Sequence, residues 1–351
     1  MTGRLELHLL APSLFWPDPS LDAIYDDLPL PNLAGLLAKS ARIEEAAQPI
    51  EPWLCRTFHV ERQEDWPVAP LTLEIDSAES IAAGDDRWIR ADPIHLRIEQ
   101  NQILLADSHV FQISAEEAQQ LTDFLNQHFG EDDRPIELLP LQPDRWYLNA
   151  TAMPPASTHL LSEAINQNMA ARLPSGTASR QWRTLLNEIQ MLLHDHPLNQ
   201  SRERRGEPAV NGVWFWGGGT LPRPATSAYT HVWSDDVLAR SLARTARIDH
   251  APLPATAELW HRSATSGSHL VLLDALYRKS RYGDAYGWRE EMKALERDWF
   301  EPLRLLSRQG KLARLTLTDI GTRGAGRFVL THRDWKKFWH RIKPFSSYLP
   351  R

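Results

Sequence analysis

Short apolar runs and amphipathic repeats alternate along much of the chain. Apolar runs bounded by turn residues predict buried strands, and they occupy residues 5–10, 213–216, 269–273, 312–319 and 327–330. Apolar side chains that recur every three to four positions predict amphipathic helices, and they occupy residues 31–40, 179–193, 235–247 and 288–306. Alternating strands and helices predict a mostly parallel sheet with helices on both faces.

The pattern changes between residues 88 and 155. A helix is expected to begin near Ser114, because Ser114 and Glu117 have the spacing of a capping box. The elements expected around it are strands at 94–98 and 103–105, the helix at 114–129, and strands at 136–141 and 146–148. This order is typical of an α+β subdomain. We therefore predict an α/β core domain of residues 1–87 and 156–351, with an insertion at 88–155.

Two stretches are predicted to lack regular structure. Residues 41–90 are charged and show no clear period. The helix at 179–193 is expected to stop at Pro197, and a basic loop with Arg202, Arg204 and Arg205 follows it. Such arginines either form a solvated face or bind phosphate, and the sequence leaves both interpretations open.

Composition narrows the classes of function. The 351 residues carry a formal net charge of −6, which argues against a general nucleic-acid binder. The only cysteine is Cys55, so no internal disulfide can form, and a reducing compartment is expected. No apolar run approaches the length of a membrane span, and the N-terminal residues lack the apolar core of a signal peptide. We expect a cytoplasmic protein that binds neither membranes nor nucleic acids.

The glycines Gly217, Gly218 and Gly219 directly follow the apolar run at 213–216. Glycines in this position let another group approach the backbone closely, and ligands of open α/β sheets lie at the carboxyl ends of strands. The glycines are therefore candidates for contact with a ligand. The sequence after them does not contain the Lys-Ser/Thr of a phosphate-binding P-loop.

Several motifs resemble those of the archaeal-type cofactor-independent phosphoglycerate mutases, which belong to the alkaline phosphatase superfamily. One set of matching residues is His196, Pro197, Asn199, Arg202, Gly206, Pro208, Ala209 and Gly217 to Gly219. The Pro-Asn-Leu sequence that starts at Pro31 is similar to a helix start of that superfamily, and residues 91–129 resemble the second domain of the mutases. The resemblance implies an alkaline-phosphatase-like α/β fold with a smaller inserted α+β subdomain.

The resemblance also implies a catalytic centre with two divalent metals, commonly manganese or zinc, which stabilise an in-line phosphoryl transfer. This sequence departs from the implied ligand set. The first strand ends in Leu10-Ala11-Pro12-Ser13 without an acid, and the expected Asp-His pair is Asp319-Ile320. His269 and Asp274 match the His-Val-Lys-x-x-Asp segment only as remnants. Ser13 or Ser20 could stand at the nucleophile position, but neither would be activated without metal.

Two hypotheses of function follow, and a third is a structural interaction protein that uses tryptophan-rich surface. The first is a degenerate phosphoglycerate-mutase-like protein, without metal or cofactor, that acts as a regulator by binding an anionic phosphorylated molecule or a protein partner. Its expected ligand contacts are Asn199, Arg202, Arg205, Gly217, Gly218, Gly219 and Arg323. The second is an active mutase or metal-dependent phosphatase with manganese or zinc held by displaced ligands. Those ligands would come from His269, Asp274, Asp319 and His332.

Overall fold

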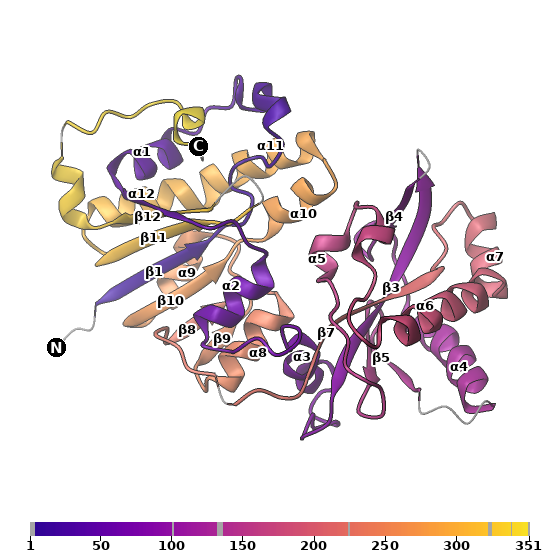
Figure 1. The fold of residues 1–351 in the computed structure, drawn as a ribbon. Coiled ribbons are helices and arrows are strands. Elements are labelled where there is room, and N and C mark those ends of the chain that lie inside the picture. The colour runs from indigo at the N-terminus through magenta and orange to yellow at the C-terminus, as the bar shows by residue number, and fades with distance from the viewer. Residues whose placement is uncertain are drawn as a thin grey trace. The chain divides into compact units, whose positions relative to one another are not determined.

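The computed structural model describes residues 4–99, 102–131, 136–223, 225–321, 325–337 and 339–349. The chain forms two compact units (Figure 1). Unit 1 contains Met1–His59 and Ala225–Arg351, and unit 2 contains Val60–Pro224. Unit 2 is therefore broader than the predicted insertion at 88–155. No helix in the described ranges is both long and apolar enough to cross a bilayer.

Unit 1 is built on a seven-stranded sheet in the order β2-β12-β11-β1-β10-β8-β9. The strands are β1 (Leu5–Leu10), β2 (Ala41–Glu45), β8 (His231–Trp233), β9 (Asp249–Ala251), β10 (Gly267–Leu272), β11 (Arg314–Asp319) and β12 (Ala325–Leu330). β11, β1, β10, β8 and β9 are parallel, and β12 and β2 add two antiparallel pairings at one side. The predicted mostly parallel α/β sheet is confirmed.

Helices cover both faces of this sheet. Leu7 and Leu9 of β1 face a core shared with the first helix and the helices of the C-terminal half (Figure 1). These helices are α1 (Pro31–Lys39), α9 (Ala257–Ser263), α11 (Ala285–Leu295) and α12 (Glu301–Arg308). The opposite face carries α2 (Ile50–Thr57) and α8 (Val237–Thr245), which pack on each other. The remaining helices are η1 (Pro19–Tyr25), α10 (Ala275–Arg281), η4 (His332–Lys336) and η5 (Phe345–Tyr348).

The helix predicted at 288–306 is continuous but contains a π-helical turn, η3 (Glu296–Phe300), between α11 and α12. Pro302 follows that turn and cannot donate a backbone hydrogen bond, which explains why the regular helix is interrupted there. Glu296 in the turn accepts hydrogen bonds from the backbone N–H groups of Asn32 and Leu33. Its carboxylate thereby caps α1, whose own preceding residue supplies no side-chain cap.

Unit 2 contains a five-stranded sheet in which a long strand, β3 (Trp88–Glu99), pairs with three others. The other strands are β4 (Gln102–Ala106), β5 (Leu138–Gln142), β6 (Arg145–Asn149) and β7 (Gly212–Gly219). Its helices are α3 (Val68–Asp76), α4 (Ala115–Glu131), α5 (Leu161–Ala164), η2 (Met169–Arg172), α6 (Ser179–His194) and α7 (Pro197–Arg204). Side chains of α4 and α6 pack on one face of the sheet, and side chains of α3 pack on the other. The capping box is confirmed, because Ser114 and Glu117 exchange the two expected hydrogen bonds.

Three predictions of local structure were wrong. The strand at 213–216 was expected in the core sheet, but it is part of β7, which pairs antiparallel with β3 of unit 2. Residues 41–90 are not irregular, since they contain β2, α2, α3 and the start of β3. The basic segment after Pro197 is a helix, because proline ends one helix and is also well suited to the first turn of the next.

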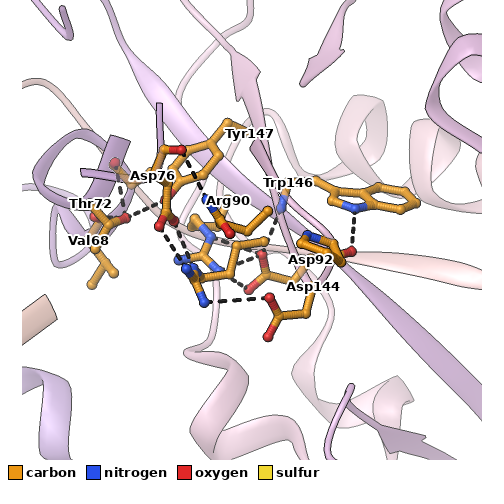
Figure 2. Close-up of polar contacts among 12 residues, drawn as sticks. Val68, Thr72, Asp76, Arg90, Asp92, Asp144, Trp146 and Tyr147 are labelled. Atoms are coloured by element: carbon orange, nitrogen blue, oxygen red, sulfur yellow. Dashed lines mark hydrogen bonds and ion pairs between the residues drawn. The ribbon is translucent and has the colours of Figure 1, made fainter. Parts of the chain in front are cut away.

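A buried charged network joins the strands of unit 2 to α3, and Figure 2 shows its members. Arg90 makes two hydrogen bonds to Asp92, of 2.9 and 2.8 Å, and both side chains are buried. Asp92 also accepts from Trp216 Nε1 at 2.8 Å. Beside this pair, Asp76 of α3 accepts from Arg145 and from the hydroxyl of Tyr147. Every charge in the network has an opposite charge beside it, as a buried charge requires.

We predict that Asp92→Asn lowers the free energy of unfolding by about 3–5 kcal/mol, because it leaves the Arg90 charge buried without its counter-charge. Urea titration monitored by circular dichroism measures this change. The matched control is Asp144→Asn, whose carboxylate is 40% exposed and 3.5 Å from Arg145; a half-exposed pair is worth less than about 1 kcal/mol. Equal losses in the two variants would contradict the assignment.

Candidate functional site

The carboxyl ends of the central parallel strands form the first candidate site, because ligands of open α/β sheets bind at this edge. β1, β10 and β11 run side by side and in register. The chain leaves them through Ala11-Pro12-Ser13, Leu273-Asp274 and Asp319-Ile320. The side chains at these three exits decide what chemistry this edge supports.

Asp319, at the end of β11, is 2% exposed and turns into the protein. Its Oδ1 accepts a hydrogen bond of 2.9 Å from the backbone N–H of Leu14. Two backbone bonds, Ala11 N–H to Thr318 O (2.9 Å) and Ser13 N–H to Ile320 O (3.0 Å), fasten the same loop to the end of β11. The carboxylate therefore anchors the loop that follows β1.

Burial dominates the ionisation of Asp319. It raises the pKa of this carboxyl to about 8, although hydrogen bonds from Leu14 and Phe15 and the charge of Arg42 act in the opposite direction. The neutral form is thus favoured near pH 7.

The loop after β1 is held on its other side by Ser13. The backbone of Ser13 lies in the left-handed region, with φ of 58°. The hydroxyl of Ser13 accepts a hydrogen bond of 2.8 Å from the hydroxyl of Ser280. The carbonyl of Ser13 accepts from Trp288 Nε1 at 2.9 Å. Ser13 is buried, so its contacts are those of a loop anchor.

The other three residues of the displaced-ligand hypothesis also have protein partners. His269 of β10 is buried, and its Nδ1 accepts from Trp233 Nε1 at 3.0 Å. Burial, followed by the neighbouring His231, lowers the pKa of His269 to about 4. Asp274 pairs with Arg278 at 2.6 Å. His332 Nδ1 lies 3.3 Å from the carbonyl of Ser307.

The described part of the chain contains no group of three or more His, Cys, Asp or Glu side chains able to hold a metal ion. At the strand ends, Ala11, Pro12 and Ile320 cannot act as ligands. The residues present at this edge do not fit the two-metal centre that the resemblance implies.

The predicted ligand contacts in unit 2 hold their own chain together. Asn199 is buried and bonds the carbonyls of Leu193 and Val210 and the N–H of Val210. Arg202 is 2% exposed. It donates to the carbonyls of Pro208 and Gln112 and to the carboxylate of Glu117. These contacts join α6, α7 and the segment before β7.

The exposed Arg205 pairs with Glu207 at 2.8 Å and with Glu117 at 3.3 Å. Gly217 to Gly219 complete β7 and are buried. A Cβ atom on Gly217, whose φ is 67°, would lie 2.9 Å from the Cβ of Val68. The group that approaches Gly217 is thus the start of α3, and Gly218 faces Ile89 of β3. Arg323, the remaining predicted contact, lies outside the described residues.

A second candidate site lies on the face of the unit 1 sheet opposite the Leu7 core. A cavity of about 600 Å³ opens there, lined by β1, β2, β11, β12 and α2. Its floor contains His8, whose Nε2 lies 2.7 Å from Thr318 Oγ1 and whose Nδ1 lies 2.5 Å from the hydroxyl of Tyr229. Burial, helped by the charge of Arg327, lowers the pKa of His8 to about 3, so the ring is neutral near pH 7.

Sequence patterns did not identify this second site. The one signal available was a histidine inside the apolar strand Leu5–Leu10, and a single histidine in a strand is more often packed in the core than functional. The arginines of the cavity come from distant positions, 56, 314 and 327. The pairing of β11 with β12 brings Arg314 and Arg327 to this sheet face, and Arg56 comes from α2.

The fold is that of an α/β protein with a mostly parallel sheet in unit 1 and an antiparallel sheet with helices in unit 2. It is shared with two solved structures. One is the PH0037 protein from Pyrococcus horikoshii (TM-score 0.55, 12% identity, 94% of this chain and 88% of that chain). The other is a cofactor-independent phosphoglycerate mutase from Thermoplasma acidophilum (TM-score 0.50, 15% identity, 99% and 94%).

A sequence relative carries the same designation. It is a probable 2,3-bisphosphoglycerate-independent phosphoglycerate mutase from Geobacter sulfurreducens, 25% identical over 162 residues. The match covers 45% of this chain and 38% of that relative, so it spans well under half of the relative's length. No family model matches the chain. The chain is similar to cofactor-independent phosphoglycerate mutases in fold, and in sequence over part of its length.

We predict that Asp319→Asn flattens the dependence of stability on pH. The pKa of Asp319 in the folded state, about 8, lies above its value in the unfolded chain. Folding therefore takes up a proton between about pH 4 and pH 8, and stability falls as the pH rises through this window. Asparagine mimics the neutral acid. Between pH 5 and pH 8 the free energy of unfolding should therefore fall less in the variant than in the wild type, by a difference of about 2 kcal/mol or more.

Urea unfolding at pH 5, 6, 7 and 8 measures this difference. The control is Asp274→Asn, which makes the same chemical change at a partly exposed carboxylate paired with Arg278 and should keep the wild-type slope. A variant at position 319 with the wild-type slope would show that Asp319 is ionised in the folded protein.

Proposed function

We propose that this chain is a phosphoglycerate-mutase-like protein without a catalytic metal centre, and that it acts by binding an anionic ligand or a partner rather than by phosphoryl transfer. The observation that carries the proposal is the position of Asp319. Its carboxyl is buried and hydrogen-bonded to the loop after β1. Asp319, which stands at the position of the Asp in the expected Asp-His pair, thus holds the loop after β1 in place.

The neighbouring strand ends support the same conclusion. An in-line phosphoryl transfer assisted by two metals needs several anionic or imidazole ligands around each cation. β1 ends in Ala11-Pro12-Ser13, and Ile320 follows Asp319. His269 and Asp274 each have a protein partner. A regulatory protein could keep the fold of an enzyme and lose this ligand set, because a fold does not determine a function.

We predict that the purified chain shows no 3-phosphoglycerate mutase activity above the blank with manganese or zinc. We also predict that it retains neither metal after dialysis, because the strand ends supply too few ligands. The assay couples 2-phosphoglycerate formation to enolase, and mass spectrometry of the dialysed protein measures metal. The Thermoplasma acidophilum mutase, assayed in parallel, is the positive control. Metal-dependent turnover that disappears in Asp319→Ala would overturn the proposal and favour an active mutase with displaced ligands.

A further inference from the structure

The cavity on the second face of the unit 1 sheet has the lining of a binding site for an anion. Neighbouring residues of the paired strands share a face, and the register places Glu6 beside Arg314 and His8 beside Thr316. Thr318 is in turn paired with Arg327. This polar row runs across three strands whose other face is apolar core. A sheet face with this many polar groups is suited to a polar ligand.

The charges around the cavity differ in sign from those of the whole chain. Its lining includes three arginines, Arg56, Arg314 and Arg327, and two glutamates, Glu6 and Glu45. With the histidines neutral, three positive and two negative charges give +1, whereas the chain carries −6. Arginine forks match the geometry of phosphate and carboxylate oxygens. The local excess therefore favours an anion.

The arginines differ in how firmly they are held. Arg327 donates to Glu45 through Nε and Nη2, so its Nη1 is not used in that pair. Arg56 Nη1 donates to Gln48 Oε1. Arg314, at the start of β11, is exposed. An anion in the cavity would thus meet one arginine oriented by a carboxylate and two others near the rim. Positioned donors lower the entropic cost of binding.

Hydroxyl groups of a ligand would also find partners in this cavity. The carboxylates of Glu6 and Glu45 accept hydrogen bonds, and the side-chain amide of Gln48 can both donate and accept. The hydroxyl of Tyr229 is held in place by His8. A volume of about 600 Å³ is in the range typical of sites for small molecules.

The position of the cavity in the chain is informative. The chain passes from unit 1 to unit 2 after His59 and returns at Ala225, and Thr57, His59, Ala228 and Tyr229 all line the cavity. Thr226 N–H donates to Phe58 O at 3.1 Å, and His59 Nδ1 lies 3.0 Å from Thr226 O. The two chain crossings are therefore bonded to each other at the cavity wall.

We propose that this cavity binds a compact phosphorylated molecule that carries hydroxyl groups, of the size of a sugar phosphate, and that its occupation stabilises the two chain crossings. Glu6, Ser268 and Arg314 line it from the first half of β1, β10 and β11, and Arg327 of β12 lines it beside Thr318, near the carboxyl end of β11. The inference rests on the proposed function, since it names where the anionic ligand of that function binds.

Isothermal titration calorimetry on the full chain tests the site, with ribose 5-phosphate as the probe and ribose as its uncharged counterpart. We expect ribose 5-phosphate to bind with Kd near or below about 1 mM and ribose to give no heat. Arg314→Gln and Arg56→Gln should each weaken binding by about fivefold or more, since each removes a charge-assisted bond to phosphate.

The matched control is Arg262→Gln, the same change at an exposed arginine of unit 1 that is not among the cavity lining residues, and it should change Kd by less than about twofold. Amide hydrogen exchange supplies a second measurement. Exchange in residues 55–59 and 226–230 should slow when ribose 5-phosphate is bound, because both segments line the cavity.

Three results would overturn the cavity assignment. They are the lack of binding up to about 10 mM ribose 5-phosphate, equal binding of ribose, or a wild-type Kd in both Arg314→Gln and Arg56→Gln. The third result would show that the chain binds the anion, but at a place other than this cavity. Failure of the proposed function has its own signal, metal-dependent turnover in the mutase assay, which does not depend on these arginines.

Discussion

The hydrogen bond from Leu14 N–H to the Asp319 carboxyl fastens the loop after β1 to the end of β11 in unit 1. A buried backbone N–H without a partner costs free energy, and the loop after β1 runs through the interior beside β11. Asp319 satisfies this requirement. The carboxyl that anchors the loop is thus the same group that the resemblance places at the edge of the sheet. The structure of the loop and the chemistry of the strand edge therefore both depend on Asp319.

The same requirement explains the residues that resemble a ligand site in unit 2. Asn199, Arg202 and Glu117 are polar, and Asn199 and Arg202 are buried. Each bonds backbone or side-chain groups where α6, α7 and α4 meet the segment before β7. A family motif can thus record a constraint of folding as well as a contact with substrate. The Arg90–Asp92 pair follows the same rule without being part of any motif (Figure 2).

Sequence patterns predicted the parallel sheet of unit 1 and most of its helices, because period and turn residues are local properties. They could not predict which sheet β7 joins. An apolar run such as Val213 to Trp216 is suited to any buried strand, and its partner β3 lies more than a hundred residues earlier. Pro197 illustrates a second limit, since proline both ends a helix and begins one. The departure at Asp319-Ile320 was visible in the sequence, but the burial of Asp319 and its bond to Leu14 were not.

The proposed ligand site lies on the same sheet as Asp319, on the face that carries His8. The sheet face that carries His8, Arg314 and Arg327 is rich in polar side chains, and these side chains line a cavity. His8 is bonded on both ring nitrogens, so it fixes Tyr229 and Thr318 and leaves the arginines to meet a ligand. In the proposal, a ligand in this cavity would contact residues next to both chain crossings, such as His59 and Ala228.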